Sequence, residues 1–178
     1  MRDIITLPGI GGSGEAHWQS RWEASDSRIR RFSPSNWDEP DLEDWVAALD
    51  RAVAQSKSEP VLVAHSLSCL LVAHWSWRGR YRASGALLVA PPDPSSPAFP
   101  SEAGGFADPP ATTLPFASLV IASNDDPFGS LNYARTSANG WGSEFMEIGA
   151  RGHINGMSGL GDWPQGRVAL ADLEARLR

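Results

Sequence analysis

Short apolar segments of β-strand length recur along this chain and are separated by longer segments with helical patterns. The four clearest runs are Ile4 to Leu7, Val61 to Ala64, Ala86 to Ala90 and Leu119 to Ala122. Uninterrupted apolar runs of this length are typical of strands that are buried on both faces of a sheet. Because helical patterns lie between them, the strands are predicted to run parallel.

Two further segments, Arg28 to Phe32 and Glu144 to Ile148, alternate apolar and polar residues, as less buried strands do. The sequence therefore predicts six strands in a mostly parallel sheet, with helices on both faces. This is an α/β fold, a three-layer α/β/α sandwich. At 178 residues and without an internal repeat, the chain is expected to form a single domain over residues 1–178.

The segments between the strands differ in how they should pack. Asp41 to Ser56 carries its apolar residues on one face at helical spacing, which predicts an amphipathic surface helix that Asp41 caps. Leu67 to Arg78 is apolar nearly all round, so this helix should be buried. Pro91 to Pro115 is rich in Pro, Ser, Ala and Gly and predicts a long loop, of the kind that often covers a site.

Ser66 lies where the second clear strand runs directly into the buried helix, in the segment VLVAHSLSCL. This leaves no room for a loop, so Ser66 must occupy a sharp turn. The arrangement is similar to the GxSxG nucleophile elbow, in which the N–H after the serine points at the oxyanion. Here that donor is Leu67, and Ala64 and Ser68 stand in place of the two glycines. A serine that begins a helix can also simply be an N-cap.

A nucleophilic serine needs a base, and the chain has four histidines to consider. The side chain of His65 should diverge from that of its neighbour Ser66, and His74 lies two turns into the buried helix. His17 stands just beyond the loop after the first strand. His153 follows the last strand, at the carboxyl edge of the sheet where open α/β folds place their ligands, and it is the predicted base.

The base in turn needs a carboxylate that fixes its tautomer, and Asp125 and Asp126 directly follow a strand. Either aspartate suits this role, although an Asp before Pro127 also commonly opens a turn. The chain order of serine, aspartate and histidine, each after a strand, is the order found in α/β-hydrolases.

A tetrahedral intermediate requires a second N–H donor, and the first strand ends in the glycine-rich loop LPGIGGSG. By its position in this loop, the backbone N–H of Ile10 is the predicted donor. A dinucleotide-binding loop is the alternative, but GxGxxG read from Gly9 fails, and no acidic partner is clearly placed after the second strand.

Four blocks of sequence carry a family resemblance over nearly the whole chain. They are LPGIGGSGEAHWQSRW, VLVAHSLSCL, IASNDDPF and WGSEFMEIGARGHINGMSGLGDWP. On these motifs the chain resembles the small α/β-hydrolases of the RBBP9/YdeN type, the serine hydrolase family. The resemblance implies a minimal α/β-hydrolase fold without a large lid.

Carried over by residue, the resemblance makes Ser66 the nucleophile and His153 the base. It makes Asp126 the acid, because Asp126 precedes Pro127 as in the family's Asp-Pro step. The chain departs from the family at Ser68, where members usually carry glycine, and the added hydroxyl could narrow the elbow or form a hydrogen bond near Ser66. The recurring HWQ segment contains His17 and Trp18, for which a structural role is expected.

The composition limits the kinds of partner and site that we expect. The net charge of -6 argues against binding to nucleic acid, which needs clustered Lys and Arg. The single cysteine, Cys69, excludes an internal disulfide and is expected to be a small buried side chain, and no Cys or His cluster predicts a metal site. No apolar stretch approaches membrane-spanning length, so we expect a cytoplasmic protein that does not span or bind a membrane. The oligomeric state does not follow from the sequence.

The predicted activity is hydrolysis of a small ester, thioester or amide through an acyl-enzyme, with a small-molecule acyl compound as substrate and no cofactor. Two alternatives use the same fold. One is a binding or regulatory protein without catalysis, because a fold does not determine a function. The other is an acyltransferase, which would use the same three residues with an acceptor other than water.

Overall fold

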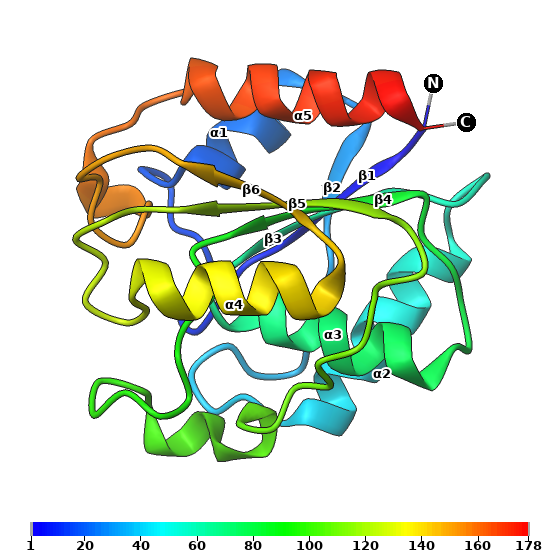
Figure 1. The fold of residues 1–178 in the computed structure, drawn as a ribbon. Coiled ribbons are helices and arrows are strands. Elements are labelled where there is room, and N and C mark those ends of the chain that lie inside the picture. The colour runs from blue at the N-terminus through cyan, green and yellow to red at the C-terminus, as the bar shows by residue number, and fades with distance from the viewer. Residues whose placement is uncertain (1, 178) are drawn as a thin grey trace.

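The computed structural model describes residues 2–177, which form one six-stranded sheet with helices on both faces (Figure 1). The strands lie in the order β2-β1-β3-β4-β5-β6, and each pairing in this sheet is parallel. This confirms the predicted six-stranded parallel sheet. The strands are β1 (Ile4–Leu7), β2 (Ile29–Arg31), β3 (Val61–His65), β4 (Gly85–Val89), β5 (Ala117–Ala122) and β6 (Glu144–Glu147).

The register of the sheet brings the carboxyl ends of the central strands to one edge. Leu7 of β1 lies beside Ala64 of β3, and His65 lies beside Val89 of β4. Val89 in turn lies beside Ile121 of β5. The segments that follow β1, β3 and β5 therefore start at the same edge of the sheet, although they are far apart in sequence.

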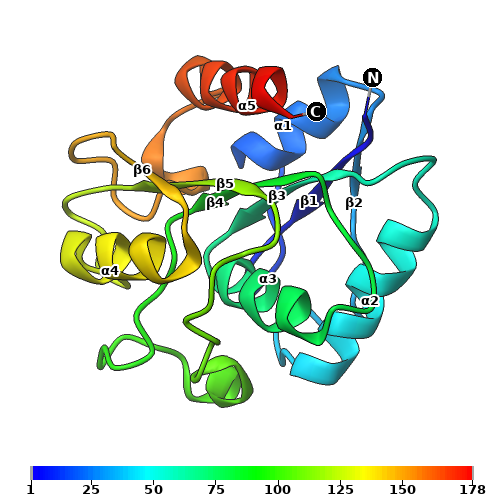
Figure 2. The same ribbon diagram turned by 45° about the vertical axis from the view of Figure 1, so that its right-hand side comes forward.

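The two faces of the sheet are covered by different helices. Figures 1 and 2 show α1 and α5 on one face, with α2, α3 and α4 on the other. Strand side chains alternate between two cores, so that Ile4 packs with α1 and α5 while Ile5 packs with α2 and α3. The helices are α1 (Trp18–Ser25), α2 (Leu42–Ala54), α3 (Leu67–Arg78), α4 (Leu131–Trp141) and α5 (Pro164–Arg176).

Two helices match their sequence predictions closely. The Asp41 carboxylate accepts a hydrogen bond from the N–H of Asp44, so it caps α2 as predicted. Helix α3 spans Leu67 to Arg78 and buries nearly all of its apolar side chains. In α1, Trp18 and Trp22 are both almost completely buried and pack this helix on the core, in keeping with the structural role expected for Trp18.

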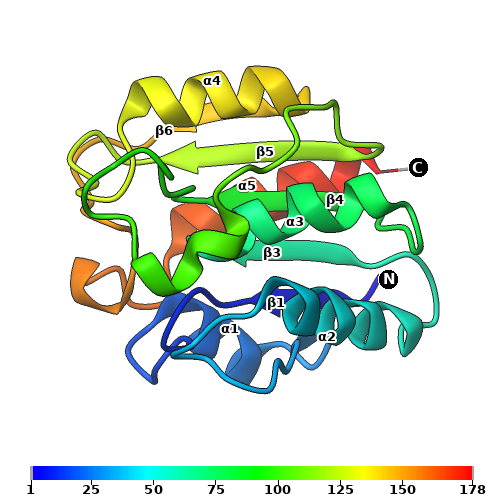
Figure 3. The same cartoon turned by 90° about the horizontal axis from the view of Figure 1, so that it is seen from below.

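The segment 91–116 is the predicted long loop, but it contains one 3-10 helix, η1 (Ser101–Phe106). Phe106 is fully buried, and its ring lies edge-on to Trp45 of α2 with centroids 5.5 Å apart. Figure 3 shows η1 beside α3, near the edge where the arrowheads of β3 and β5 end. Within residues 2–177, no helix has the length and apolar character needed to cross a membrane.

Candidate active site

Ser66 occupies a strained turn between β3 and α3. Its backbone angles are φ 56° and ψ −125°, a conformation that is rare for a residue with a side chain. The strand ends at His65 and the helix begins at Leu67, so the turn consists of Ser66 alone. Although Ser66 stands at the N-cap position, its side chain makes no capping hydrogen bond. The N-cap interpretation of this serine is therefore wrong.

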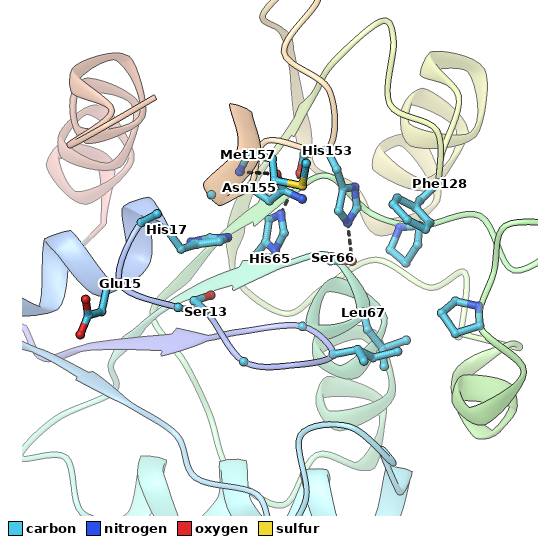
Figure 4. A pocket seen from close by; sticks show the side chains of 18 of the residues that line it. Ser13, Glu15, His17, His65, Ser66, Leu67, Phe128, His153, Asn155 and Met157 are labelled. Carbon is cyan, nitrogen blue, oxygen red and sulfur yellow. Dashed lines mark hydrogen bonds between the residues drawn. The ribbon is translucent and has the colours of Figure 1, made fainter. Parts of the chain in front are cut away.

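The hydroxyl of Ser66 instead contacts a histidine that is linked to a carboxylate. Ser66 Oγ lies 2.8 Å from His153 Nε2, the contact drawn as a dashed line in Figure 4. His153 Nδ1 lies 2.9 Å from each carboxylate oxygen of Asp126, and the two side chains are only 11% and 3% exposed. A carboxylate only accepts hydrogen bonds, so Nδ1 carries the proton and Nε2 can accept from the serine.

The structure distinguishes the two aspartates that the sequence left open. Asp126 bonds His153 and also accepts from the N–H of Phe128 at 2.9 Å. Asp125 accepts from the Ser123 hydroxyl and from the N–H of Gly152, both at 2.7 Å, and these bonds lower its pKa. Asp125 therefore ties the end of β5 to the histidine loop, while Asp126 is the aspartate that contacts the imidazole.

The loop after β1 passes directly against the turn at Ser66. A Cβ added to Gly9 would lie 3.0 Å from Ser66 Cβ and 3.5 Å from the Leu67 nitrogen, so this close approach favours glycine. Ile10 follows Gly9, and both Ile10 and Leu67 line the same cavity as Ser66. The next amide along, that of Gly11, already donates to a carbonyl of the neighbouring loop, at Trp37.

Ser68 directs its hydroxyl away from the substrate side of the turn. Its Oγ donates to the Pro8 carbonyl at 2.6 Å, and the residue is completely buried. The hydroxyl therefore links the first turn of α3 to the loop that carries Ile10. The expected hydrogen bond near Ser66 is present, and it is made with the neighbouring loop.

The cavity beside Ser66 has a volume of about 640 Å³ and two kinds of wall (Figure 4). Several of its apolar residues come from segment 91–116 and from the turns after β1, β3 and β5. They are Ile10, Leu67, Pro92, Phe99, Pro100 and Phe128. The polar side chains in the lining include Ser13, Glu15, His17 and Asn155. The predicted loop thus contributes to the site.

The other histidines hold structural hydrogen bonds. His65 Nε2 lies 2.9 Å from the carbonyl oxygen of His153, and burial, reinforced by His153 and His17, lowers the pKa of His65 well below its usual value. His17 Nδ1 accepts from the Gln19 N–H at the start of α1. Burial, with Arg31 and His153, lowers the pKa of His17 to about 4. Both imidazoles are therefore neutral at pH 7. The sequence did not indicate the hydrogen bonds that His65 and His17 make with the backbone.

Cys69 lies one turn into α3 and is fully buried, with Sγ 3.3 Å from the Val89 carbonyl oxygen. Burial raises the pKa of its thiol, which makes the thiolate inaccessible at neutral pH. The expectation of a small buried side chain is confirmed. Among residues 2–177, no three His, Cys, Asp or Glu side chains are grouped to hold a metal ion.

Comparisons with known proteins give a family and several structural relatives. The sequence model of the family described as serine hydrolase matches residues 4–172. A putative YdeN-like hydrolase from Pectobacterium atrosepticum is 31% identical, with a TM-score of 0.89 over 99% of this chain and 92% of that one. Among curated proteins, none matches the chain.

More distant structures share the fold. The ydeN gene product of B. subtilis is 20% identical, with a TM-score of 0.79 over 99% of this chain and 100% of that one. A monoacylglycerol lipase from Paleococcus ferrophilus is 11% identical, with a TM-score of 0.65 over 84% of this chain and 85% of that one. At these identities the likeness is one of fold alone.

Proposed function

The chain belongs to the serine hydrolase family and is a small esterase-like hydrolase of the YdeN type, and we propose that Ser66, His153 and Asp126 are its catalytic triad. The observation that carries this proposal is the 2.8 Å contact between Ser66 Oγ and His153 Nε2 at a strained turn. A serine hydroxyl that does not cap its helix, bonded to an imidazole that a buried carboxylate orients, is the arrangement that nucleophilic catalysis requires.

In the first half of the proposed reaction, Ser66 Oγ attacks the carbonyl carbon of the substrate as its proton passes to His153 Nε2. Asp126 stabilises the imidazolium that forms. The backbone N–H groups of Ile10 and Leu67 stabilise the oxyanion, and the start of α3 adds positive potential. When the intermediate collapses, His153 returns its proton to the leaving alcohol, thiol or amine, and Ser66 carries the acyl group as an ester.

In the second half, water replaces the leaving group. His153 takes a proton from the water as its oxygen attacks the acyl-enzyme, and the same N–H groups stabilise the second oxyanion. Collapse breaks the bond to Ser66 Oγ, which regains its proton from His153, and the carboxylic acid leaves. The apolar cavity wall around Phe99 and Phe128 supports an acyl group of hydrocarbon character.

The test compares two serines at helix starts. Ser66→Ala should reduce ester hydrolysis by about 10⁴ to 10⁶ and abolish labelling by a fluorophosphonate probe, without loss of the fold. Ser130 is the matched control, because its hydroxyl does cap α4 by accepting from the Tyr133 N–H at 3.1 Å. Ser130→Ala should lose about 1 kcal/mol of stability and keep its activity.

Mass spectrometry of the labelled peptide would locate the probe. Unchanged turnover in Ser66→Ala, or a folded wild-type protein that the probe never labels, would refute the proposed triad and favour a binding protein on a hydrolase fold. Products formed in the presence of added alcohols or amines would separate hydrolysis from acyl transfer.

A further inference from the structure

The residue after the proposed base has a backbone conformation that its side chain disfavours. Ile154 has φ +49°, in the left-handed region, and isoleucine is β-branched. Gly152, on the other side of His153, also lies in this region with φ +55°. A β-branched residue stays in such a conformation only when its surroundings hold it there.

Two side chains hold this turn through consecutive backbone carbonyls. His65 Nε2 lies 2.9 Å from the His153 oxygen, and Trp18 Nε1–H donates to the Ile154 oxygen at 2.8 Å. Both side chains are themselves buried, His65 at the end of the buried strand β3 and Trp18 on the inner side of α1, and the two residues are 5% and 1% exposed. In Figure 4, His65 lies between His17 and Ser66, close to the His153 loop.

The protonation state of His65 suits this contact. A carbonyl oxygen only accepts, so the neutral His65 ring must carry its proton on Nε2 and donate it to His153. Trp18 is a donor under all conditions. Since both donors are rigid rings fixed by packing, they constrain where the backbone on either side of the Ile154 peptide can lie.

We infer that His65 and Trp18 are positioning residues, which hold the backbone of His153 so that its Nε2 stays within hydrogen-bond distance of Ser66 Oγ. The inference rests on the proposed function of the triad. A displacement of about 1 Å at a reacting group can cost about 100-fold in rate, so a loosened turn should show in turnover. It also assigns a task to the histidine before the nucleophile and to the tryptophan of the HWQ segment.

The test uses two tryptophans of the same helix. Trp18→Phe removes the donor to Ile154, while Trp22→Phe removes an equivalent donor, because Trp22 Nε1 lies 2.7 Å from the Asp162 oxygen and Trp22 is also fully buried. Both variants should lose stability to a similar extent. Only Trp18→Phe should lower kcat and the rate of fluorophosphonate labelling, by about 10-fold to 100-fold, with KM changed by less than about 3-fold.

A second pair tests His65. His65→Leu removes the donor, whereas His65→Gln places an amide N–H near the position of Nε2 and should restore most of the lost kcat. The inference is overturned if Trp18→Phe and Trp22→Phe lose kcat equally, or if His65→Leu and His65→Gln are alike.

A readout without turnover separates this inference from the proposed function. The proton on His153 Nδ1, bonded to Asp126, should give a low-field NMR signal that reports the position of the ring. It should be shifted or lost in Trp18→Phe and retained in Trp22→Phe. An inactive wild-type protein would refute the proposed function, and the NMR comparison would still decide whether these side chains position His153; equal spectra for both variants would overturn the inference.

Discussion

Replacing Ser68 with glycine, the residue expected from the family resemblance, should lower the stability of the folded protein without raising its activity. The Ser68 hydroxyl is the donor to the Pro8 carbonyl at 2.6 Å in a completely buried position. Loss of the donor leaves a buried carbonyl without this partner, which costs about 1 to 3 kcal/mol. Glycine adds up to about 1 kcal/mol in a helix, so Ser68→Gly should lose about 1 to 4 kcal/mol and Ser68→Ala slightly less.

For a chain of this size, 1 kcal/mol corresponds to about 2 to 4 °C in Tm, so Ser68→Gly should melt about 2 to 16 °C lower. Thermal unfolding followed by circular dichroism at 222 nm measures this shift, and ester hydrolysis at 25 °C measures kcat. We expect kcat to fall, because the Pro8 loop carries Ile10.

Ser84 provides the matched control for Ser68. Its hydroxyl also donates to a proline carbonyl, that of Pro60 at 3.1 Å, but the Ser84 N–H donates to the same oxygen at 2.8 Å. Ser84→Ala therefore leaves the carbonyl paired and should cost less than about 1 kcal/mol. If Ser68→Gly were as stable as wild type and turned over faster, the hydroxyl would be an obstruction at the turn, and our interpretation of it would be refuted.

Three further predictions concern ionisable side chains. His17 stays neutral in the folded protein down to pH about 4, while an unfolded histidine binds a proton near pH 6.5. The free energy of unfolding should therefore fall by about 3 kcal/mol as the pH drops from 6.5 to about 4, and the low pKa of His65 adds a fall of the same sign. Urea denaturation should find a smaller fall in His17→Asn, whose amide oxygen can still cap α1. An equal fall in this variant would contradict the assignment of the effect to His17. Asp126→Asn should lower kcat by about 10⁴ and Asp125→Ala by less than about 10-fold, as steady-state kinetics would measure, and the reverse order would exchange the roles of the two aspartates. Cys69 should react with iodoacetamide only after unfolding, so rapid alkylation of the native protein, detected by mass spectrometry, would disprove its burial.

The central strands were predictable because they are buried on both faces of the sheet. Such strands are continuous apolar runs that are too short for a helix. Helices α4 and α5 were not predicted as individual elements. Helix α4 buries Ala134, Ala138 and Trp141, and the buried side of α5 includes Gly166 and Ala169. Small residues let a helix pack closely on a sheet but add little to an apolar stripe, and in α5, where the stripe is weak, the sequence therefore carries little signal for a helix.

The residues of the candidate site likewise include some that the sequence indicated and others that it did not. Chain order and strand ends indicated Ser66, Asp126 and His153, because parallel strands place their carboxyl ends at one edge. The supporting contacts left no such pattern. Trp18 bonds a carbonyl 136 positions away, and His65 bonds one 88 positions away. The direction of the Ser68 hydroxyl likewise depends on a turn and a loop that meet only in the folded chain.

Residues that position the triad and part of the apolar wall of the cavity lie on opposite faces of the sheet. Trp18 and Ile154 belong to the core on the face of α1 and α5, whereas Phe99 packs against the core on the opposite face. The start of segment 91–116 is linked to the triad, because the Asp93 N–H donates to the Phe128 carbonyl at 2.8 Å and the Phe128 and His153 rings lie 4.6 Å apart. Phe99, by contrast, is half-buried, and its N–H donates within the segment, to the Ser96 carbonyl. Evolution or laboratory diversification could therefore change the part of this segment around Phe99, and with it the substrate preference, while Phe106 and the contacts of the reaction centre stay in place.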